Sequence, residues 1–354
     1  MGREIVGLKI GASRLAAARV SLNGSARLLQ TASMPLPPGI VSGGEVRDVD
    51  SLADVLKAFF DQHKLPRRSV RVGVANNRVG VRTIDLAGID DPKQLGNAVR
   101  FRAQEALPIP LTEAVMDYQV LSHSTDAEGQ LVRRVLFVVA YRDLIDSFAQ
   151  ACRQAGLRLV GIDLEGFALL RALAPLGPSA SDGERSALVA ISIGAERSTL
   201  AVTDGLSCEF TRVLDWGGSA LTSVIARELG IEPLEAEELK RAISLDGSVT
   251  PDGVDEGQAA KAREAILLNL QSFARELVSS LQFYQNQPGS LGIREIVLAG
   301  GTAKLGGFAE ALQRMVAVSV RVGDPLVNIG HGKKAGNGDA DPSLAIPIGL
   351  GMGI

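Results

Sequence analysis

The sequence is poor in the residues that carry redox, metal and aromatic-stacking chemistry. Its 354 residues include two cysteines, three histidines and one tryptophan, and aromatic side chains make up 4% of the chain. Cys152 and Cys208 have no CxxC spacing and no neighbouring histidine, so we expect two buried thiols rather than a disulfide or metal ligands. The histidines are His63, His123 and His331, and they share no ligand spacing. The sequence therefore predicts neither a metal centre nor histidine-based catalysis.

A strong charge excess and a long hydrophobic run are also lacking. The 37 basic and 40 acidic residues give a formal net charge of −3, which argues against a nucleic-acid partner or an anionic membrane surface but is compatible with a local basic patch. No apolar run approaches the ~20 residues that span a bilayer, and the charged N-terminus does not resemble a signal peptide. We expect a cytoplasmic protein without direct membrane insertion.

The chain is too long for one ordinary core, and its opening pattern occurs twice. Single cores stop growing near ~250–300 residues, so 354 residues predict two lobes. Ile10–Arg14 reads Ile-Gly-Ala-Ser-Arg, and Ile193–Arg197 reads Ile-Gly-Ala-Glu-Arg. Each follows an alternating apolar strand and leads into a second strand, and Asn23-Gly24 predicts a further hairpin turn after the first pair. The repeat predicts one such lobe in each half of the chain.

Helical periodicity predicts the elements between these strands. Apolar residues recur at helical spacing behind Asp50 and again on one face from Ile266 to Tyr284. Helices are expected at about 52–60, 92–106, 219–229, 234–242, through 266–284, and up to about 316. The apolar C-terminal segment 345–354 is expected to pack into the first lobe.

Three loops have residues suited to a nucleotide. Turns of small residues let backbone N–H groups approach phosphates, and a Gly-Gly-Thr turn before a helix offers backbone to a nucleoside. The candidate nucleotide-binding residues in these loops are Gly11, Ala12, Ser13, Arg14, Gly194, Ala195, Glu196, Arg197, Ser198, Gly300, Gly301, Thr302 and Lys304.

In order and separation, these loops resemble the phosphate 1, phosphate 2 and adenosine motifs of the actin/Hsp70/sugar-kinase superfamily. Within it the chain resembles, nearly end to end, the PilM family of type IV pilus assembly, whose nearest relative in fold is FtsA. The most specific stretch is 98–120, in which a helix ends at Pro108-Ile109-Pro110 before an Asp-Tyr strand. The segment 163–168 resembles the one that PilM places before its second lobe. In 236–240, Glu237 and Lys240 resemble the acid and lysine beside the nucleoside, although an i, i+3 surface pair explains them equally well.

The resemblance implies an α/β, two-lobed actin-like (actin/Hsp70/FtsA) fold with an inserted module similar to the FtsA 1C domain. The first lobe is expected to comprise 1–78 together with 163–187 and 325–354. The module is expected at 79–162 and the second lobe at 188–324.

The chain departs from the superfamily at the residues that organise a metal. An Asp usually stands two residues before each phosphate-loop glycine, and this chain has Lys9 and Ser192 there. An ammonium cannot ligate a metal. Lys9 either contacts a phosphate or is paired locally, and Ser192 either reaches a metal-bound water or is a structural serine. ATP or ADP is therefore the expected cofactor, without Mg²⁺ and with hydrolysis absent or very slow; Asp163 and Glu165 are the remaining catalytic candidates, with capping or ion pairing as the alternative.

The resemblance further implies a PilN-like inner-membrane protein as partner, bound through its N-terminal segment and holding this protein at the membrane periphery, with contacts to other pilus assembly proteins or motor ATPases. The groove is expected between the module and the first lobe. Its candidate residues are Val99, Phe101, Arg102, Pro108 and Ile109. Docking of the module onto its own lobe explains the same apolar residues.

Three alternatives stay open at this point. One is a Mg²⁺-dependent ATPase or small-molecule kinase that uses Asp163 or Glu165 as base. Another is a component similar to the secretion protein GspL. The third is an FtsA-like membrane-tethered filament, which would need an amphipathic C-terminal helix that the Ile346-Pro347-Ile348 ending does not supply.

Overall fold

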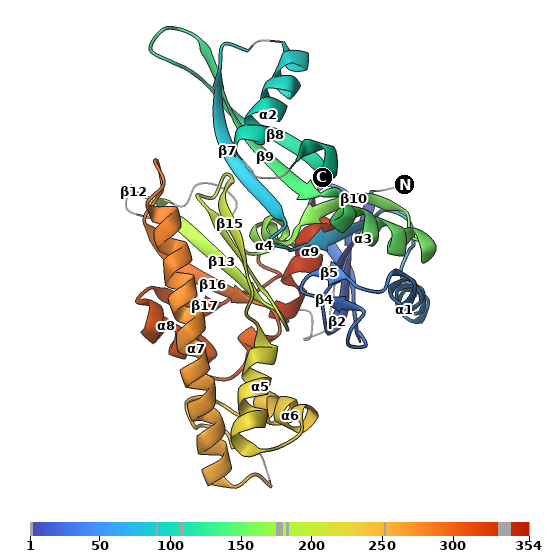
Figure 1. Cartoon of the computed structure of the whole chain (residues 1–354), viewed down its shortest axis with the longest axis vertical. Coiled ribbons are helices and arrows are strands. Elements are labelled where there is room, and N and C mark those ends of the chain that lie inside the picture. Colours follow the sequence, from blue (N-terminus) through green and yellow to red (C-terminus); the bar gives the residue numbers. More distant parts are fainter. Residues whose placement is uncertain are drawn as a thin grey trace.

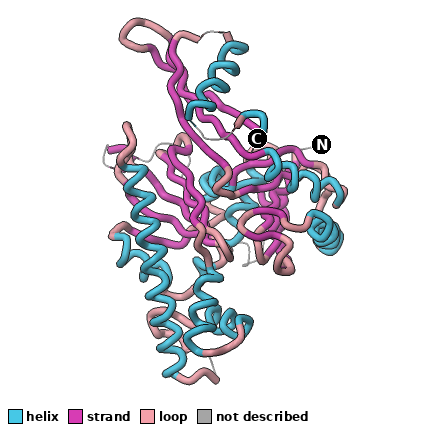
Figure 2. Tube along the Cα trace, viewed as in Figure 1, coloured by secondary structure: helices cyan, strands magenta, loops and turns pink. Residues whose placement is uncertain are grey.

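The structure is a computed structural model. It describes residues 3–89, 91–106, 110–174, 180–181, 184–250, 253–331 and 341–353. Within these ranges, two large sheets lie on either side of a pair of short helices, and a smaller sheet projects from one end (Figures 1 and 2).

The first lobe contains a six-stranded sheet of order β10-β6-β1-β2-β3-β18. Its strands are β1 (Glu4–Ile10), β2 (Arg14–Ser21), β3 (Arg27–Pro35), β6 (Val70–Val74), β10 (Leu159–Leu164) and β18 (Gly330–His331). The first three form the antiparallel meander that the turns predict, and β1, β6 and β10 run parallel. Helices α1 (Val49–Gln62) and α3 (Arg142–Gln154) pack their apolar stripes on this sheet. Asp48 begins α1 by accepting a hydrogen bond from Ser51 N.

The second lobe repeats this order as β15-β14-β13-β16-β17. Its strands are β13 (Ala187–Ile193), β14 (Ser198–Thr203), β15 (Cys208–Leu214), β16 (Ile293–Ala299) and β17 (Ser319–Val322). Its helices are α5 (Gly218–Leu229), α6 (Pro233–Ala242), α7 (Glu256–Gln285), η2 (Thr302–Lys304) and α8 (Phe308–Val316). In both lobes the turn pairs its first and last strand residues, Ile10 with Leu15 and Ile193 with Ser198. The duplication that the repeated motif predicts is thus present.

The inserted module is a three-stranded antiparallel sheet of order β7-β9-β8. It comprises β7 (Val79–Ala87), α2 (Pro92–Ala106), η1 (Leu111–Glu113), β8 (Ala114–Thr125) and β9 (Leu131–Tyr141). Its own core gathers around Val99 and Phe137. The expected module, 79–162, differs from this at its C-terminal end: α3 packs on α1 and β10 pairs with β6, so both belong to the first lobe.

Two short helices lie between the large sheets. They are α4 (Glu165–Leu173) and α9 (Ala345–Met352). Buried residues of both helices form a core with the second-lobe sheet, and α9 also packs on the first-lobe strands β2 and β3. The apolar C-terminal segment is thus a buried helix against β1, β2 and α4, as its sequence predicts. The remaining elements are β4 (Val41–Ser42), β5 (Glu45–Val46), β11 (Ala180–Ser181), β12 (Glu184–Arg185) and η3 (Pro342–Leu344).

The close approach of α9 to α4 predicts that one methyl group added between these helices lowers the stability of the fold strongly. A Cβ at Gly349 would overlap the carbonyl oxygen of Ala168, and that atom belongs to the backbone, so it cannot rotate away. We expect Gly349→Ala to lower the free energy of unfolding by about 2–4 kcal/mol, because one helix must move. Urea unfolding followed by circular dichroism measures it. Gly292→Ala, where a Cβ would meet open space, is the control and should change stability by less than about 0.5 kcal/mol; equal stability of the two variants would contradict the tight packing.

Candidate functional site

The two repeated turns face each other across a narrow cleft between the lobes. The turns are closed by matching hydrogen bonds, Gly11 N to Arg14 O at 3.0 Å and Gly194 N to Arg197 O at 2.9 Å. A cavity of about 60 Å³ lies between them. Its lining includes Lys9, Ile10, Gly11, Ala12, Gly44, Gly73, Glu165, Gly194, Ala195, Glu196, Arg197 and Thr199. Ser13 and Arg14 lie beside it on the exposed side of the first turn.

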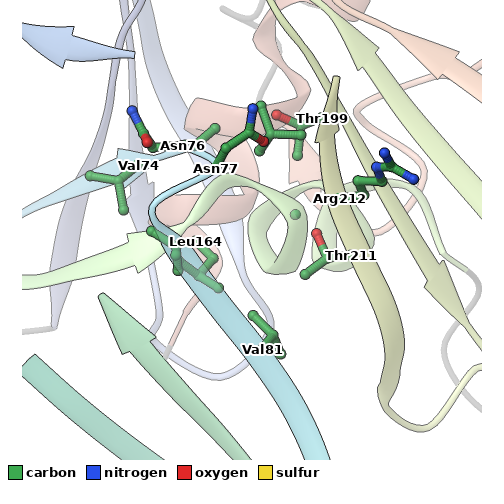
Figure 3. A pocket seen from close by; sticks show the side chains of 12 residues that line it. Val74, Asn76, Asn77, Val81, Leu164, Thr199, Thr211 and Arg212 are labelled. Carbon is green, nitrogen blue, oxygen red and sulfur yellow. The ribbon is translucent and has the colours of Figure 1, made fainter. Parts of the chain in front are cut away.

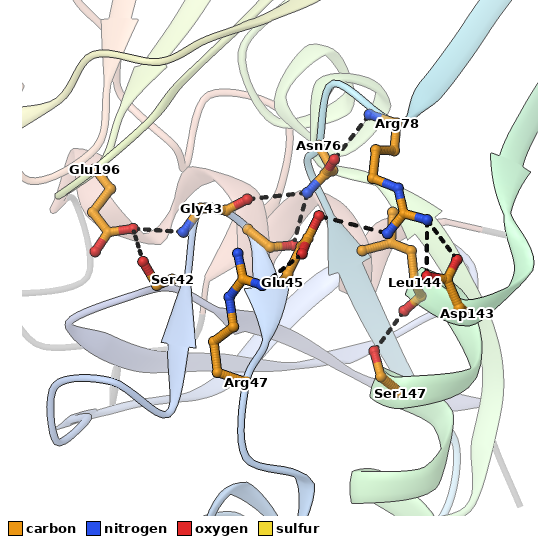
Figure 4. A network of polar contacts seen from close by, with 11 residues as sticks. Ser42, Gly43, Glu45, Arg47, Asn76, Arg78, Asp143, Leu144, Ser147 and Glu196 are labelled. Carbon is orange, nitrogen blue, oxygen red and sulfur yellow. Dashed lines mark hydrogen bonds and ion pairs between the residues drawn. The ribbon is translucent and has the colours of Figure 1, made fainter. Parts of the chain in front are cut away.

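The second-lobe turn also bridges the two lobes. The Glu196 carboxylate accepts hydrogen bonds from Gly43 N at 2.7 Å and from Ser42 Oγ at 3.3 Å, in the turn between β4 and β5 (Figure 4). The Asn76 side-chain amide supports that turn by donating to the carbonyls of Gly43 and Gly44. No sequence motif pointed to this turn; its adjacent glycines, both at positive φ, were the one available signal.

The two residues that replace the usual carboxylates are both engaged in the structure. Lys9 lies 3.5 Å from the buried carboxylate of Glu165, which also accepts a hydrogen bond from Thr199 Oγ1 at 3.5 Å. Ser192 is buried between Thr199 and Ala299 in the second-lobe sheet. Glu165 therefore lines the cleft beside the Lys9 ammonium. The two opposite charges can hold each other's side chains in position.

The structure separates the other catalytic candidate from this cleft. Asp163 pairs with the guanidinium of Arg171, whose Nε donates to Gly349 O at 2.9 Å. Asp163 does not line either described cavity. Ser198 is also engaged elsewhere, because its buried hydroxyl donates to Trp216 O at 2.7 Å.

The adenosine-type residues converge at the start of α5. Lys240 Nζ donates to Gly218 O at 2.9 Å and to Thr222 Oγ1 at 2.8 Å, and it pairs with Glu237 at 2.5 Å. A Cβ at Gly218 would lie 2.5 Å from Thr302 Oγ1, so this glycine permits the close approach of the loop at 300–302. The sequence motifs did not identify Thr222 and Gly218 as members of this cluster. The signal available for them was Gly217-Gly218 directly before a helix.

The charges of this cluster shift its titration. Partial burial raises the pKa of Glu237, but hydrogen bonds from Lys240 and Thr222 and the nearby positive charges outweigh it, so the pKa lies below its ordinary value. Burial lowers the pKa of Lys240, opposed by Glu237. The Glu237 carboxyl is thus ionised at neutral pH.

The residues of the third loop, 300–304, differ in whether they contact the second turn. Gly300 has a φ of 88°, and a Cβ there would overlap the Ile193 backbone, so the position requires glycine. Thr302 Oγ1 donates to Gly194 O at 3.3 Å, which joins the loop to the second turn. Lys304 instead pairs with Asp341 at 2.8 Å.

A larger cavity, of about 180 Å³, lies where the module joins both lobes (Figure 3). Its lining residues are Val74, Ala75, Asn76, Asn77, Val79, Val81, Leu164, Gly166, Thr199, Thr211, Arg212 and Val213. They come from the ends of β6 and β10, the turn after β6, the start of β7, the first turn of α4 and the second-lobe strands β14 and β15. Several of its polar groups are already paired, such as Asn77 with Asp215 and Thr211 with Leu200 O, whereas Arg212 is exposed.

The predicted partner residues on α2 do not line this cavity. Val99 is fully buried in the module core, whereas Phe101 is 60% exposed. Arg102 is exposed and pairs with Glu105 at 3.3 Å. Pro108 and Ile109 lie outside the described residues.

The model of the family described as type IV pilus assembly protein PilM matches residues 7–353. The chain belongs to the PilM family. A chain of a solved PilM-PilN type IV pilus biogenesis complex is 28% identical to this protein, with a TM-score of 0.82 and coverage of 99% of this chain and 98% of that one. The cell division protein FtsA of Escherichia coli K12 is 24% identical over 91% of this chain and 84% of its own length. MreB5 of Spiroplasma citri bound to AMPPNP shares the fold, with 11% identity, a TM-score of 0.57 and coverage of 98% and 94%.

These findings confirm the two-lobed actin-like fold for this PilM-family chain and do not favour the kinase or GspL-like alternatives. Among the described residues, no helix is long and apolar enough to cross a membrane, and no group of three metal-ligating side chains occurs. Both cysteines are free, and burial raises the pKa of each thiol to about 12. Cys152 is buried as expected, whereas Cys208 is only partly buried.

The Glu237–Lys240 pair predicts a pH-dependent contribution to stability. Because the folded-state pKa of Glu237 is lowered, its stabilisation is fully present above the ordinary value of 4.5 and is lost as pH falls through the folded value. We expect Glu237→Gln to lower the free energy of unfolding by about 1.5–3 kcal/mol at neutral pH, since Lys240 loses a charged partner. That difference should shrink below about pH 4.5. Glu235→Gln is the control, because Glu235 lies on the same helix and has no ion pair with any described residue. A pH-independent difference would contradict the assignment.

Proposed function

We propose that this PilM-family protein acts in type IV pilus assembly by capturing the N-terminal segment of a PilN-like inner-membrane protein at the junction of the module and the lobes. The observation that carries the proposal is the cavity of about 180 Å³ shared by the module root, the first lobe and the second lobe. The solved PilM-PilN complex supports the choice of partner. Through that partner the protein would lie at the cytoplasmic face of the membrane.

The cavity has the chemistry of a site for an extended segment. Val74, Val79, Val81 and Leu164 provide an apolar floor, and the exposed guanidinium of Arg212 lies at its rim. Two of the strands that border it, β7 and β15, are edge strands of their sheets. Extended peptides bind such places through backbone hydrogen bonds along an edge and side chains in pockets.

Filling the cavity should weaken partner binding. We expect Val81→Trp to lower the affinity for a peptide of the partner's N-terminal segment by more than about tenfold, or about 1.4 kcal/mol, because the indole occupies the floor. Isothermal titration calorimetry measures the change. Val322→Trp places the same side chain at a strand position that is 43% exposed and distant from the lining, and it should bind as wild type.

The exposed face of α2 is the competing surface. Phe101→Ala removes its largest exposed side chain, and we expect the peptide affinity to change by less than about twofold. If Phe101→Ala abolished binding while Val81→Trp did not, the partner site would belong to α2 and not to the cavity.

We further propose that the interlobe cleft binds ATP or ADP without needing Mg²⁺. The supporting observation is that two cationic side chains, Lys9 and Arg197, line the cleft between the repeated turns. The guanidinium of Arg197 pairs with Asp215 through Nη2 at 2.9 Å, whereas its buried Nη1 has no hydrogen-bond partner among the described residues, so an anion would satisfy Nη1. The cluster around Lys240 would lie against the nucleoside. Hydrolysis is expected to be absent or very slow, since metal and electrostatic positioning carry phosphoryl transfer.

Metal independence of nucleotide binding can be measured directly. We expect ATP affinity to change by less than about threefold between Mg²⁺ and EDTA, and Lys9→Met to lower it by about tenfold, since the ammonium replaces the cation. Fluorescence anisotropy of a labelled ATP measures both. Lys261→Met, at an exposed site on α7, is the control. Loss of binding in EDTA would show that a metal holds the phosphates.

A further inference from the structure

Basic side chains precede each of the first-lobe strands β1, β6 and β10. Arg3 stands directly before β1, Arg67 and Arg68 before β6, and Arg158 directly before β10. Because β1, β6 and β10 run parallel, their N-terminal ends lie together at one edge of the sheet, the edge formed by the strand ends and not by an outer strand. This edge lies on the side of the first lobe that carries the N-terminus, away from the second lobe (Figure 1).

Two helices end at the same edge and add further cations. Lys64 follows the end of α1, and Arg153 lies in the last turn of α3. Backbone hydrogen bonds hold the segments together, with Arg158 N donating to Arg67 O at 2.8 Å and Val70 N to Arg158 O at 3.0 Å. We call Arg3, Lys64, Arg67, Arg68, Arg153 and Arg158 the basic rim.

Local structure accounts for part of the rim only. Arg67 pairs with Asp61 at 2.6 Å, and Lys64 and Arg153 offset the negative ends of the helix dipoles. Arg68 and Arg158 are exposed, precede strands and have no ion pair among the described residues. The carboxylate of Glu4, the residue after Arg3, pairs with Arg19 at 2.7 Å. Net positive charge is thus concentrated on one edge of a chain whose formal charge is −3.

We propose that the basic rim binds the anionic phospholipid headgroups of a membrane surface. Neither described cavity lies at the rim, which argues against a site for a single small anion and for an extended anionic surface. Flat arrays of exposed Lys and Arg act on anionic membranes in this way.

The position of the basic rim is compatible with the proposed capture of a segment of a membrane-anchored partner. This inference rests on that proposed function. The cavity lies at the C-terminal end of β6 and the rim at its N-terminal end. The five residues of β6 correspond to about 17 Å of strand. A few residues of extended partner chain would cover that distance, so the tether and the rim can engage the same membrane.

Vesicle sedimentation tests the proposal with the full chain. We expect wild type to sediment with phosphatidylcholine vesicles containing about 30% phosphatidylglycerol, not with pure phosphatidylcholine, and to be released as salt shortens the screening length to about 3 Å. Each cation removed should lower the partition coefficient about fivefold, the equivalent of about 1 kcal/mol. The triple variant Arg68→Gln, Arg153→Gln, Arg158→Gln should therefore bind about a hundredfold more weakly.

A matched variant and two further measurements make the outcome decisive. The control carries Lys261→Gln, Arg275→Gln and Arg314→Gln, three exposed second-lobe cations, so it has the same net charge and should bind vesicles as wild type. Circular dichroism melting checks that both variants fold. Equal vesicle binding by the two variants, no vesicle binding by wild type, or tighter binding of wild type to duplex DNA than to the vesicles would each overturn the proposal. Peptide titration without vesicles tests the partner proposal separately, because the triple variant should bind the peptide as wild type.

Discussion

The close approach of backbones between α9, β1 and α4 determines how the two lobes are arranged. A Cβ at Gly7 would overlap the carbonyl oxygen of Pro347, and one at Gly349 would overlap that of Ala168. Helix α9 therefore lies directly on β1 and on α4. Since α4 also packs on β13 and β14, the position of one glycine helix sets the distance between the first-lobe and second-lobe sheets. The width of the cleft and the meeting of its two turns depend on that distance.

The contacts across the cleft show how a chain that lacks the usual metal-organising carboxylates fills the space with its own charges. Lys9 meets Glu165, and Glu196 reaches the backbone of Gly43 in the other lobe. The lobes are thus held together by protein groups. An anion that enters the cleft must displace the Glu196 carboxylate or bind beside Arg197. Because Glu196 joins the two lobes, anion binding in the cleft and the relative position of the lobes are linked.

The sequence predicted those features that depend on local pattern. The Ile-Gly-Ala-x-Arg repeat identified both meanders, and the helical stripes identified α1 and α7, because period and turn chemistry are local properties. It could not show that Lys9 pairs with Glu165 or that Asp163 pairs with Arg171, since these depend on how distant segments meet. The apolar pattern of α2 predicted the same role for Val99 and Phe101, but the fold buries Val99 and exposes Phe101. The sequence does not determine where the module ends, because α3 and β10 have ordinary patterns that fit either body.

The module leaves the first lobe and returns to it at neighbouring points. Val79 begins β7 directly after the Asn76–Arg78 turn, and it pairs with Ala140 at the end of β9. The two chain connections between the first lobe and the module therefore lie side by side, as the two ends of a short loop do. Lengthening the chain between such ends adds little to the entropic cost of loop closure. Insertions, deletions or wholesale replacement between these two points would leave the strand register of the lobe unchanged. The module is in this sense an exchangeable part, in which a new binding specificity can arise without refolding the body that carries it.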